Sequence, residues 1–291
     1  MDIGLTLPTM ISGVTRDTTI EWCRRIDAGP FSTLALGERI AYPNQELFVT
    51  MAAAAVLTER VRIMSTVVVL PMHAAVEVAK QAATIDVLSD GRLTLGLGVG
   101  GRDEDYRALE ASFDRRHQRL DDQVAQMRQV WAGDPPFADM APVGPAPVQP
   151  GGPPLYSGAL GPLAIARSAE WAEGICGFSL DPIAEDHRAT FGRIEAAWTK
   201  AGRTDKPRHV SSFWYATGPE GQARLHAYSH RYLAIFGDEM AQAMADLCSA
   251  WSGDRVREAI DRFEQAGCDE LLLVPTSTDP DEVDRLADLL A

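Results

Sequence analysis

The stretch KQAATIDVLSDGRLTLGLGVGG, residues 80–101, joins a helix pattern to a strand pattern and then to glycines. Alanines at the packing positions of its first half predict a helix that ends at Ser89-Asp90-Gly91. The apolar run at residues 93–97 predicts a buried parallel strand. Glycines at the carboxyl end of such a strand let a flat ligand or a phosphate approach the main chain, and in a parallel barrel that end carries the active site. This stretch therefore predicts a cofactor site.

Eight candidate strands alternate with helices along the chain, which predicts an α/β fold of the (β/α)8 TIM-barrel type. The strands are expected at residues 3–7, 33–36, 62–70, 93–97, 155–156, 174–178, 209–216 and 270–274. The helices are expected at residues 18–28, 45–57, 74–88, 103–131, 163–171, 182–201, 254–265 and 281–290, with a helix pair in 220–250. Residues 1–291 are expected to form a single domain.

The glycines at residues 96–101 also have a superficial likeness to a dinucleotide-binding fingerprint. Their spacing differs from GxGxxG, their strand is the fourth and not the first, and no acidic strand end follows at the expected distance. A doubly wound nucleotide-binding fold is therefore the less favoured alternative.

Residues 132–154 differ from the rest because they contain eight prolines among glycines. This composition excludes a helix or a central strand. A domain linker is one interpretation, but the alternation of strands and helices continues unchanged beyond it. We therefore expect a long Pro/Gly-rich insertion on the barrel rim that borders the mouth of the active site.

Composition excludes several classes of function. The formal net charge of -14 argues against non-specific nucleic-acid binding, which requires clustered Lys and Arg. No apolar run is long enough for a membrane span and the N-terminus does not resemble a signal peptide, so a cytoplasmic protein is expected. The four cysteines and six histidines show no metal-site spacing, so no metal site is predicted and the cysteines are expected to be reduced packing residues.

Three groups of residues are candidates for chemistry, and each has a simpler structural explanation. Glu38 and Arg39 follow the second strand, where they form either a ligand contact or a rim salt bridge. His73 follows the third strand and serves either in acid/base work or as a solvated loop residue. Ala159, Leu160 and Gly161 precede a helix that starts at Pro162, so their N–H groups either bind an anion or form an ordinary tight turn.

Two further segments have open interpretations. The basic run at residues 114–119 either meets the anionic tail of a cofactor or is the solvated start of a helix, and we favour the latter. The apolar helix surface at residues 51–56 is wider than one core-facing stripe needs, which favours a subunit interface over ordinary core packing.

The order and spacing of several segments make nearly the whole chain similar to the bacterial luciferase-like superfamily of flavin- or deazaflavin-dependent oxidoreductases. These segments are Gly37-Glu38-Arg39, residues 58–62, residues 80–101, residues 119–131 and residues 157–162. The resemblance implies a TIM barrel with one FMN or one coenzyme F420 at its C-terminal face, and commonly a homodimer.

The resemblance also assigns cofactor-binding residues. It implies a bulge behind the ring of the cofactor, often with a non-proline cis peptide, at Thr66, Val67 and Val68. It implies that Gly98 and Val99 lie beside the same ring. It implies that the cofactor phosphate lies at the turn formed by Ser157, Gly158, Ala159, Leu160 and Gly161.

The chain departs from the superfamily at two positions. Many relatives carry a proton-transferring His where this chain has Arg39, and a guanidinium stays charged at neutral pH, so it anchors an anion but does not shuttle protons. Sugar-phosphate-oxidising relatives place an acid where this chain has Arg102, so oxidation of glucose 6-phosphate is not expected.

These observations predict an oxidoreductase that transfers a hydride to or from a small organic substrate, with the candidate catalytic residues Glu38, Arg39 and His73. Coenzyme F420 is the preferred cofactor because residues 37–42 resemble deazaflavin-using relatives, and FMN is the alternative. An FMN-dependent monooxygenase that uses oxygen, or a non-catalytic flavin-binding barrel suggested by Arg39, remain alternatives. A lyase-type barrel is disfavoured because the three lysines fall on expected helices or their ends. The pattern does not identify the substrate.

Overall fold

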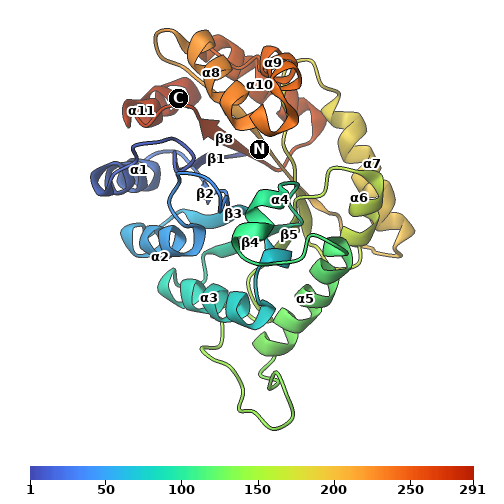
Figure 1. Cartoon of the computed structure of the whole chain (residues 1–291). Helices are drawn as coiled ribbons and strands as arrows, with labels where there is room; N and C mark the ends of the chain where they lie inside the picture. The colour runs from blue at the N-terminus through green and yellow to red at the C-terminus, as the bar shows by residue number, and fades with distance from the viewer.

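A computed structural model describes residues 1–291, in which eight parallel strands form a closed barrel in chain order (Figure 1). The strands are β1 (Asp2–Thr6), β2 (Thr33–Leu36), β3 (Arg62–Val69), β4 (Leu93–Gly98), β5 (Leu155–Ser157), β6 (Gly174–Cys176), β7 (Arg208–Tyr215) and β8 (Glu270–Pro275). Pairing of β1 with β8 closes the ring. The (β/α)8 TIM barrel expected from the sequence is confirmed.

Helices alternate with the strands and cover the outside of the barrel (Figure 1). They are α1 (Arg16–Ala28), α2 (Leu47–Leu57), η1 (Leu70–Met72), α3 (Ala75–Leu88), α4 (Asp103–Ala108), α5 (Arg116–Trp131), α6 (Pro162–Ser168), α7 (His187–Lys200), α8 (Gly221–Leu233), η2 (Ala234–Phe236), α9 (Asp238–Asp246), α10 (Gly253–Ala266) and α11 (Asp281–Leu290). None of these helices is both long and apolar enough to span a membrane.

The single helix expected at residues 103–131 is wrong, because the chain forms two helices there. Glu110 and Arg115 adopt left-handed φ angles of 54° and 53°, which end α4 and delay the start of α5. The Tyr106 hydroxyl donates a hydrogen bond to the carbonyl of Val99 at 2.6 Å and so ties α4 to the end of β4. The helix expected at residues 182–201 likewise begins later, at His187, where the Asp186 side chain caps it.

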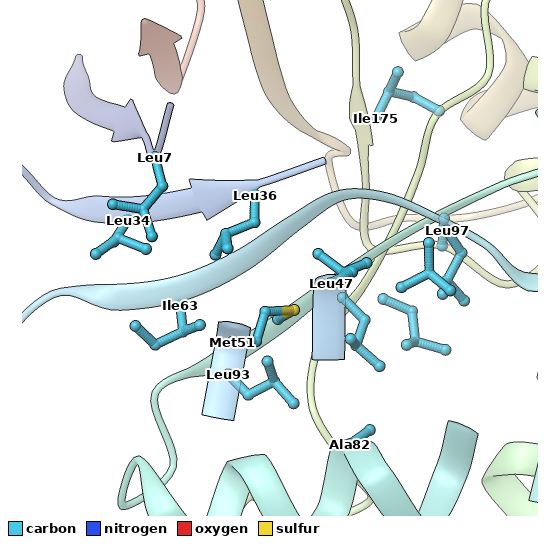
Figure 2. Packing of buried hydrophobic residues seen from close by; sticks show 14 of the residues in the cluster. Leu7, Leu34, Leu36, Leu47, Met51, Ile63, Ala82, Leu93, Leu97 and Ile175 are labelled. Carbon is cyan, nitrogen blue, oxygen red and sulfur yellow. The ribbon is translucent and has the colours of Figure 1, made fainter. Parts of the chain in front are cut away.

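The main core lies between the outer face of the barrel and the helices. Figure 2 shows Leu34 and Ile63 of neighbouring strands packed near Met51 of α2, with Ala82 of α3 beside Leu93. Ala79, Ala82 and Ala83 are fully buried, so α3 approaches the strands closely, as the alanine pattern predicts. The inner face forms a separate cluster of Ala35, Met64, Tyr156, Cys176, Val210 and Leu272.

Helix α2 contributes to the core and also presents apolar side chains to solvent. Met51, Ala54 and Ala55 are buried, whereas Val49 is 71% exposed and Val56 is 63% exposed. The buried residues support ordinary core packing, and the exposed valines support a subunit interface. The homodimer therefore stays a prediction.

Arg92 lies directly before β4 and connects this strand to α2 and to the segment before β3. Its guanidinium donates hydrogen bonds to the carbonyls of Ala55 and Thr58 at the end of α2 and to that of Val61 before β3, at 2.6 to 2.9 Å. It thereby satisfies carbonyls that a helix end leaves free. Arg92, one of the residues on which the superfamily resemblance rests, therefore has a structural role.

The Pro/Gly-rich segment, residues 132–154, lies at the amino ends of the strands, so its expected position beside the active-site mouth is wrong. Gln149 binds the Asp86 carboxylate and the Leu93 carbonyl, and Lys80 donates to the Gly144 carbonyl. In Figure 1 the segment projects beyond α3 and α5. The reason is topological: it connects a helix to β5, and such connections reach the amino ends of the strands, opposite the βα loops that carry active sites.

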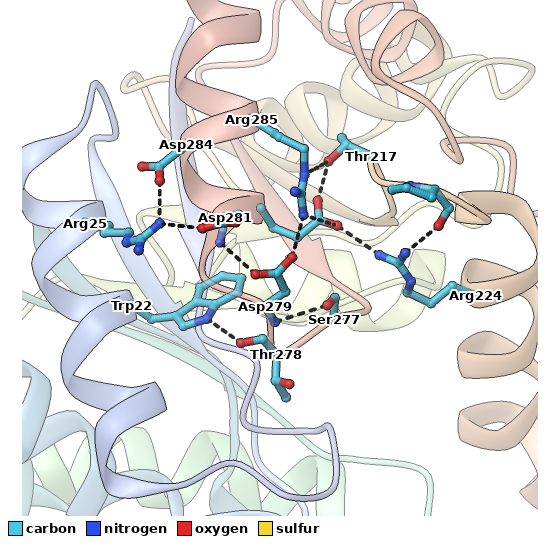
Figure 3. A network of polar contacts seen from close by, with 12 residues as sticks. Trp22, Arg25, Thr217, Arg224, Ser277, Thr278, Asp279, Asp281, Asp284 and Arg285 are labelled. Carbon is cyan, nitrogen blue, oxygen red and sulfur yellow. Dashed lines mark hydrogen bonds and ion pairs between the residues drawn. The ribbon is translucent and has the colours of Figure 1, made fainter.

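A polar network attaches α11 to the start of α8 and to α1 (Figure 3). The Glu282 carboxylate is 1% exposed and accepts hydrogen bonds from Thr217, from Arg224 at 3.0 Å and from Arg285 at 3.1 Å. Arg25 of α1 binds Asp281 at 3.0 Å and also Asp284. These contacts fix the last helix against the first helix, α1, and against the start of α8.

Replacing Glu282 by glutamine is expected to lower the free energy of unfolding by about 1.5–3 kcal/mol, because hydrogen bonds to a buried charged group are lost. Glu258→Gln is the control, since Glu258 forms an exposed pair with Arg262 at 3.6 Å, and it should cost less than about 0.5 kcal/mol. Urea unfolding of both variants measures the difference. Equal effects would show that the network does not stabilise the fold.

Candidate active site

The third strand bulges toward the interior of the barrel at Val67. The pairing of β3 with β4 shifts register between Ser65 and Val68, and the Thr66–Val67 peptide is cis. Glycines make room for the bulge: a Cβ on Gly96 would lie 2.3 Å from the Ser65 carbonyl oxygen, and one on Gly98 would lie 2.7 Å from a Val67 methyl. Gly96 and Gly98 therefore make room for Ser65 and Val67 of the bulge.

Three cavities meet at Val67, and we name them lobes A, B and C. Lobe A has a volume of about 430 Å³ and is lined by residues 67, 98–101, 116–117, 120–121, 157–161, 164, 167–168 and 171. Lobe B has a volume of about 560 Å³ and is lined by residues 6, 10, 37–38, 66–67, 158, 160, 176–178, 180, 185, 212, 214, 228, 232–233, 236, 244 and 274. Lobe C has a volume of about 180 Å³ and is lined by residues 38–39, 66–67, 69, 72, 100–102, 105–106 and 232.

Lobe A contains the turn that the sequence analysis assigned to a phosphate. Gly158 donates its N–H to the Leu97 carbonyl at 2.8 Å, but the N–H groups of Ala159, Leu160 and Gly161 have no main-chain acceptor. A group of donors with no acceptor beside a cavity suits an anion. The neighbouring Gly98 and Val99 line the same lobe, as the resemblance implies for residues beside the ring.

Two arginines and a histidine line the same lobe. Arg116, His117 and Arg167 line it, together with the carboxylate of Asp121, which pairs with Arg167. The pKa of His117 is lowered by partial burial and by the charges of Arg116 and Arg167. A negatively charged group in lobe A would relieve this repulsion.

The basic run at residues 114–119 supplies Arg116 and His117 to lobe A, and its Arg119 fixes the preceding loop. Arg119 donates to the carbonyls of Pro71, Ser112 and Asp114, so it holds the loop before α5 in place. Residues 114, 115, 117 and 118 are exposed at the start of α5, which agrees with the interpretation as a solvated helix start, and Arg116 and His117 also line lobe A. The sequence analysis did not identify Arg167, since a single arginine on a short helix carries no motif.

Glu38 lies where lobes B and C meet. Its side chain is 1% exposed, and its carboxylate accepts hydrogen bonds from the Val69 N–H at 2.6 Å and from His73 Nε2 at 2.9 Å. Both contacts come from the end of β3 and the turn that follows. Glu38 is thus held rigidly at the carboxyl end of the barrel.

His73 binds Glu38 and is largely buried, so the solvated loop interpretation is wrong. It lines none of the three lobes, so it has no direct access to a molecule bound in them. Its side chain is 18% exposed, and its ring packs edge-on against Phe48. Burial lowers the pKa of His73, but the hydrogen bond and charge of Glu38, with Glu46 and Glu77, more than offset this and leave the pKa raised. His73 reaches the cavity only through Glu38.

The raised pKa of His73 predicts a pH-dependent contribution to stability. A folded-state pKa above the unfolded value stabilises the fold fully below about pH 6.5, and this contribution is lost as pH rises through the folded pKa. The difference in Tm between the native chain and His73→Gln should therefore be largest at mildly acidic pH and should shrink at alkaline pH. A difference that grows with pH would contradict the Glu38–His73 ion pair.

Arg39 is buried in an ion-pair cluster at lobe C. Its Nε donates to Asp105 and its Nη2 to Glu104, each at 2.8 Å, and the Tyr42 ring lies 4.7 Å from its Cζ. Asp105 also accepts the N–H groups of Ile40 and Ala41. Arg39 therefore forms a salt bridge, which was one of the two interpretations of Glu38-Arg39. It also lines lobe C, where it can contact a ligand. The partners Glu104 and Asp105 begin α4, as expected, but their pairing with Arg39 was not predicted.

The wall of lobe B is largely apolar, contains five aromatic rings and comes from segments without a recognisable motif. The Trp214 ring of β7 packs edge-on against Phe178, with centroids 4.6 Å apart, and against Tyr232, with centroids 5.2 Å apart. Tyr228 and Tyr232 belong to α8 and Met244 to α9, so these helices cover the lobe. No sequence signal marked these residues, because apolar side chains on helices also serve the core.

Comparison with known proteins provides an independent view of the chain. The family model described as luciferase-like monooxygenase matches residues 1–289. An uncharacterized protein of Mycobacterium tuberculosis is 28% identical over 214 residues, which cover 64% of this chain and 73% of that protein.

Two solved structures share the fold. An F420-dependent secondary alcohol dehydrogenase in complex with an F420-acetone adduct has a TM-score of 0.78 and 18% identity, covering 99% of this chain and 97% of that chain. The oxygenating constituent of 3,6-diketocamphane monooxygenase from Pseudomonas putida, a type II Baeyer-Villiger monooxygenase in complex with FMN, has a TM-score of 0.75 and 16% identity, covering 99% of this chain and 95% of that chain.

Proposed function

This chain belongs to the luciferase-like monooxygenase family, and from that premise we propose that it is an oxidoreductase that binds coenzyme F420 and transfers a hydride to or from a small organic molecule. FMN is the alternative coenzyme. The single observation that carries the proposal is the meeting of three lobes at Val67, one of them lined by Arg116, Arg167 and residues 159–161, whose N–H groups have no main-chain acceptor.

The residues present suit a coenzyme with a phosphate and a planar ring. Lobe A would hold the phosphate through the N–H groups of residues 159–161 and the charges of Arg116 and Arg167. Val67, Gly98 and Val99, which line lobe A, would lie against the ring. Bound in this way, the coenzyme supplies the hydride-carrying ring system, and the protein supplies binding and orientation.

Two observations support F420 over FMN. The sequence at residues 37–42 resembles deazaflavin-using relatives, and His117 and Arg116 lie on the exposed side of lobe A, where an anionic oligoglutamate tail would emerge. The structures that share the fold include an F420 enzyme and an FMN enzyme, so both coenzymes suit this architecture.

Glu38, His73 and Arg39 would have different roles toward the bound molecules. Glu38 reaches the junction of lobes B and C, and His73 holds its carboxylate in place and exchanges a proton with it at Oε1. Arg39 stays positively charged beside Asp105 and therefore orients polar groups in lobe C without carrying protons. Glu38 and Arg39 act in the cavity, whereas His73 acts as a positioning residue.

A binding titration tests the proposal. Purified protein is titrated with F420, with FMN and with the deazaflavin chromophore that lacks phosphate, and binding is followed by fluorescence. F420 should bind more tightly than its phosphate-free analogue by roughly 10- to 100-fold, which corresponds to one or two charge-assisted hydrogen bonds.

Tighter binding of FMN would favour the alternative coenzyme. Binding without turnover on any substrate would favour the non-catalytic barrel. No binding of any of the three compounds, or equal binding with and without phosphate, would contradict the proposal.

A further inference from the structure

Lobe B differs from lobe A in charge. No Arg, Lys or His side chain lines it, and its two carboxylates are those of Glu38 and Glu185. Lobe A, in contrast, is lined by the guanidinium groups of Arg116 and Arg167. An anionic group in lobe B would therefore lose its hydration shell without gaining a positive partner.

Some residues line lobe B alone and some are shared with the other lobes. Val67, Gly158 and Leu160 are shared with lobe A, and Glu38, Thr66, Val67 and Tyr232 with lobe C. The shared residues surround the junction at Val67, where the coenzyme ring would lie. Thr6, Phe178, Trp214 and Tyr228 belong to lobe B alone, so they surround the space that remains for a second molecule.

The side chains of this space form an aromatic wall. Trp214 contacts Phe178, Tyr228 and Tyr232 edge-on, with interplanar angles of 62°, 75° and 69°. Edge-to-face and offset arrangements are favourable between aromatic rings, so a planar ring would extend this cluster. The lobe volume of about 560 Å³ lies within the range of small-molecule sites.

One polar group at the floor of the lobe has no partner. Thr6 ends β1, is 5% exposed, and its Oγ1 makes no hydrogen bond. The nearby Ser212 hydroxyl is already used, since it donates to the Gly177 carbonyl at 2.9 Å. A buried hydroxyl without a partner is costly, and a ligand atom that hydrogen-bonds to it would remove that cost.

We infer that lobe B selects a planar aromatic molecule that carries no anionic group and presents a carbonyl or hydroxyl oxygen to Thr6. This inference rests on the proposed function for the statement that the bound molecule is the substrate of the coenzyme. The selection itself depends only on residues of lobe B.

Paired ligands test the charge selection. Isothermal titration of the purified chain, with and without saturating F420, compares β-acetylnaphthalene with β-naphthoate, which has a similar shape and one negative charge. The neutral ketone should bind at least roughly 10-fold more tightly in both preparations, because the carboxylate has no cationic partner.

Two methionines on α9 provide a matched pair of variants. Met244 lines lobe B, whereas Met240 is 54% exposed and does not line it. Met244→Lys should reduce the preference for the ketone by about 10-fold or more by supplying a positive partner for naphthoate, and Met240→Lys should leave the preference unchanged. Circular dichroism confirms that both variants are folded.

A third comparison tests the contact to Thr6. Thr6→Val should weaken binding of β-acetylnaphthalene by roughly 2- to 12-fold, as expected for one neutral hydrogen bond, and should leave binding of β-ethylnaphthalene unchanged. An equal loss for both compounds would show that Thr6 contributes packing and not a hydrogen bond, which would overturn that part of the inference.

The outcomes separate this inference from the proposed function. Equal or tighter binding of naphthoate to a chain that binds F420 would overturn the selection and leave the coenzyme assignment intact. A chain that binds no coenzyme but prefers the neutral ketone would overturn the proposed function alone. Binding of neither naphthalene would overturn the assignment of lobe B as an aromatic site.

Discussion

Replacing Gly161 by aspartate is expected to weaken coenzyme binding by roughly 30- to 150-fold, which corresponds to about 2–3 kcal/mol of repulsion between a carboxylate and a phosphate at short range. Gly161 lines lobe A, its N–H has no main-chain acceptor, and a Cβ placed there meets no atom within 4 Å. The Cβ of the new side chain therefore meets no protein atom, and its carboxylate adds a negative charge to the lobe.

The same substitution is expected to stabilise the folded chain slightly. Gly161 is the N-cap residue of α6, in an extended conformation with φ of -95°, and no side chain caps this helix. Aspartate at an N-cap accepts a hydrogen bond from the first turn and is at least as favourable as glycine there. Coenzyme affinity and thermal stability should thus change in opposite directions.

Gly161→Asn is the matched control, because asparagine caps the helix with a similar shape but without charge. It should bind the coenzyme within a few-fold of the native chain, and the ratio of the two dissociation constants measures the electrostatic part alone. Fluorescence titration with F420 gives both constants. Equal affinities of the aspartate and asparagine variants would place the phosphate outside lobe A.

Gly96→Ala is expected to lower the free energy of unfolding by about 3 kcal/mol or more, the upper range for overpacking. The added Cβ would lie 2.3 Å from the Ser65 carbonyl oxygen and 3.2 Å from a Val67 methyl. The carbonyl belongs to the main chain of the bulge, so it yields only if β3 moves. Such a movement would also displace Val67, the residue common to all three lobes.

Gly101→Ala is the control for this effect, because a Cβ on Gly101 meets nothing within 4 Å although the residue lines lobes A and C. Its stability should equal or slightly exceed that of the native chain, since alanine restricts the unfolded state more than glycine does. Thermal unfolding should show Gly96→Ala melting roughly 6–12 °C lower, at 2–4 °C per kcal/mol. Similar melting temperatures for the two variants would contradict the close packing of the bulge.

The sequence predicts the barrel well because its signals are local. Most strands contain a short apolar run, and the alanines of α3 mark the face that packs on the strands. The candidate phosphate turn was also predictable, since Pro162 begins α6 directly after the small residues of the turn. These features depend on neighbours in the chain and on the regular order of parallel strands.

The parts that were missed depend on contacts between distant residues. Arg39 and Asp105 are 66 positions apart, and nothing in either segment specifies their pairing. The aromatic wall of lobe B combines Phe178, Trp214 and Tyr232 from three separate segments. The location of the Pro/Gly-rich segment was open to deduction, because a connection from a helix to a strand must reach the amino end of that strand.

The central claim is that a coenzyme with a phosphate and a tricyclic ring binds where the three lobes meet. A crystal structure of the chain with F420 tests it most directly. The account predicts the phosphate within hydrogen-bond distance of the N–H groups of residues 159–161, and the ring against Val67. A phosphate bound elsewhere, or a ring that does not contact Val67, would contradict it.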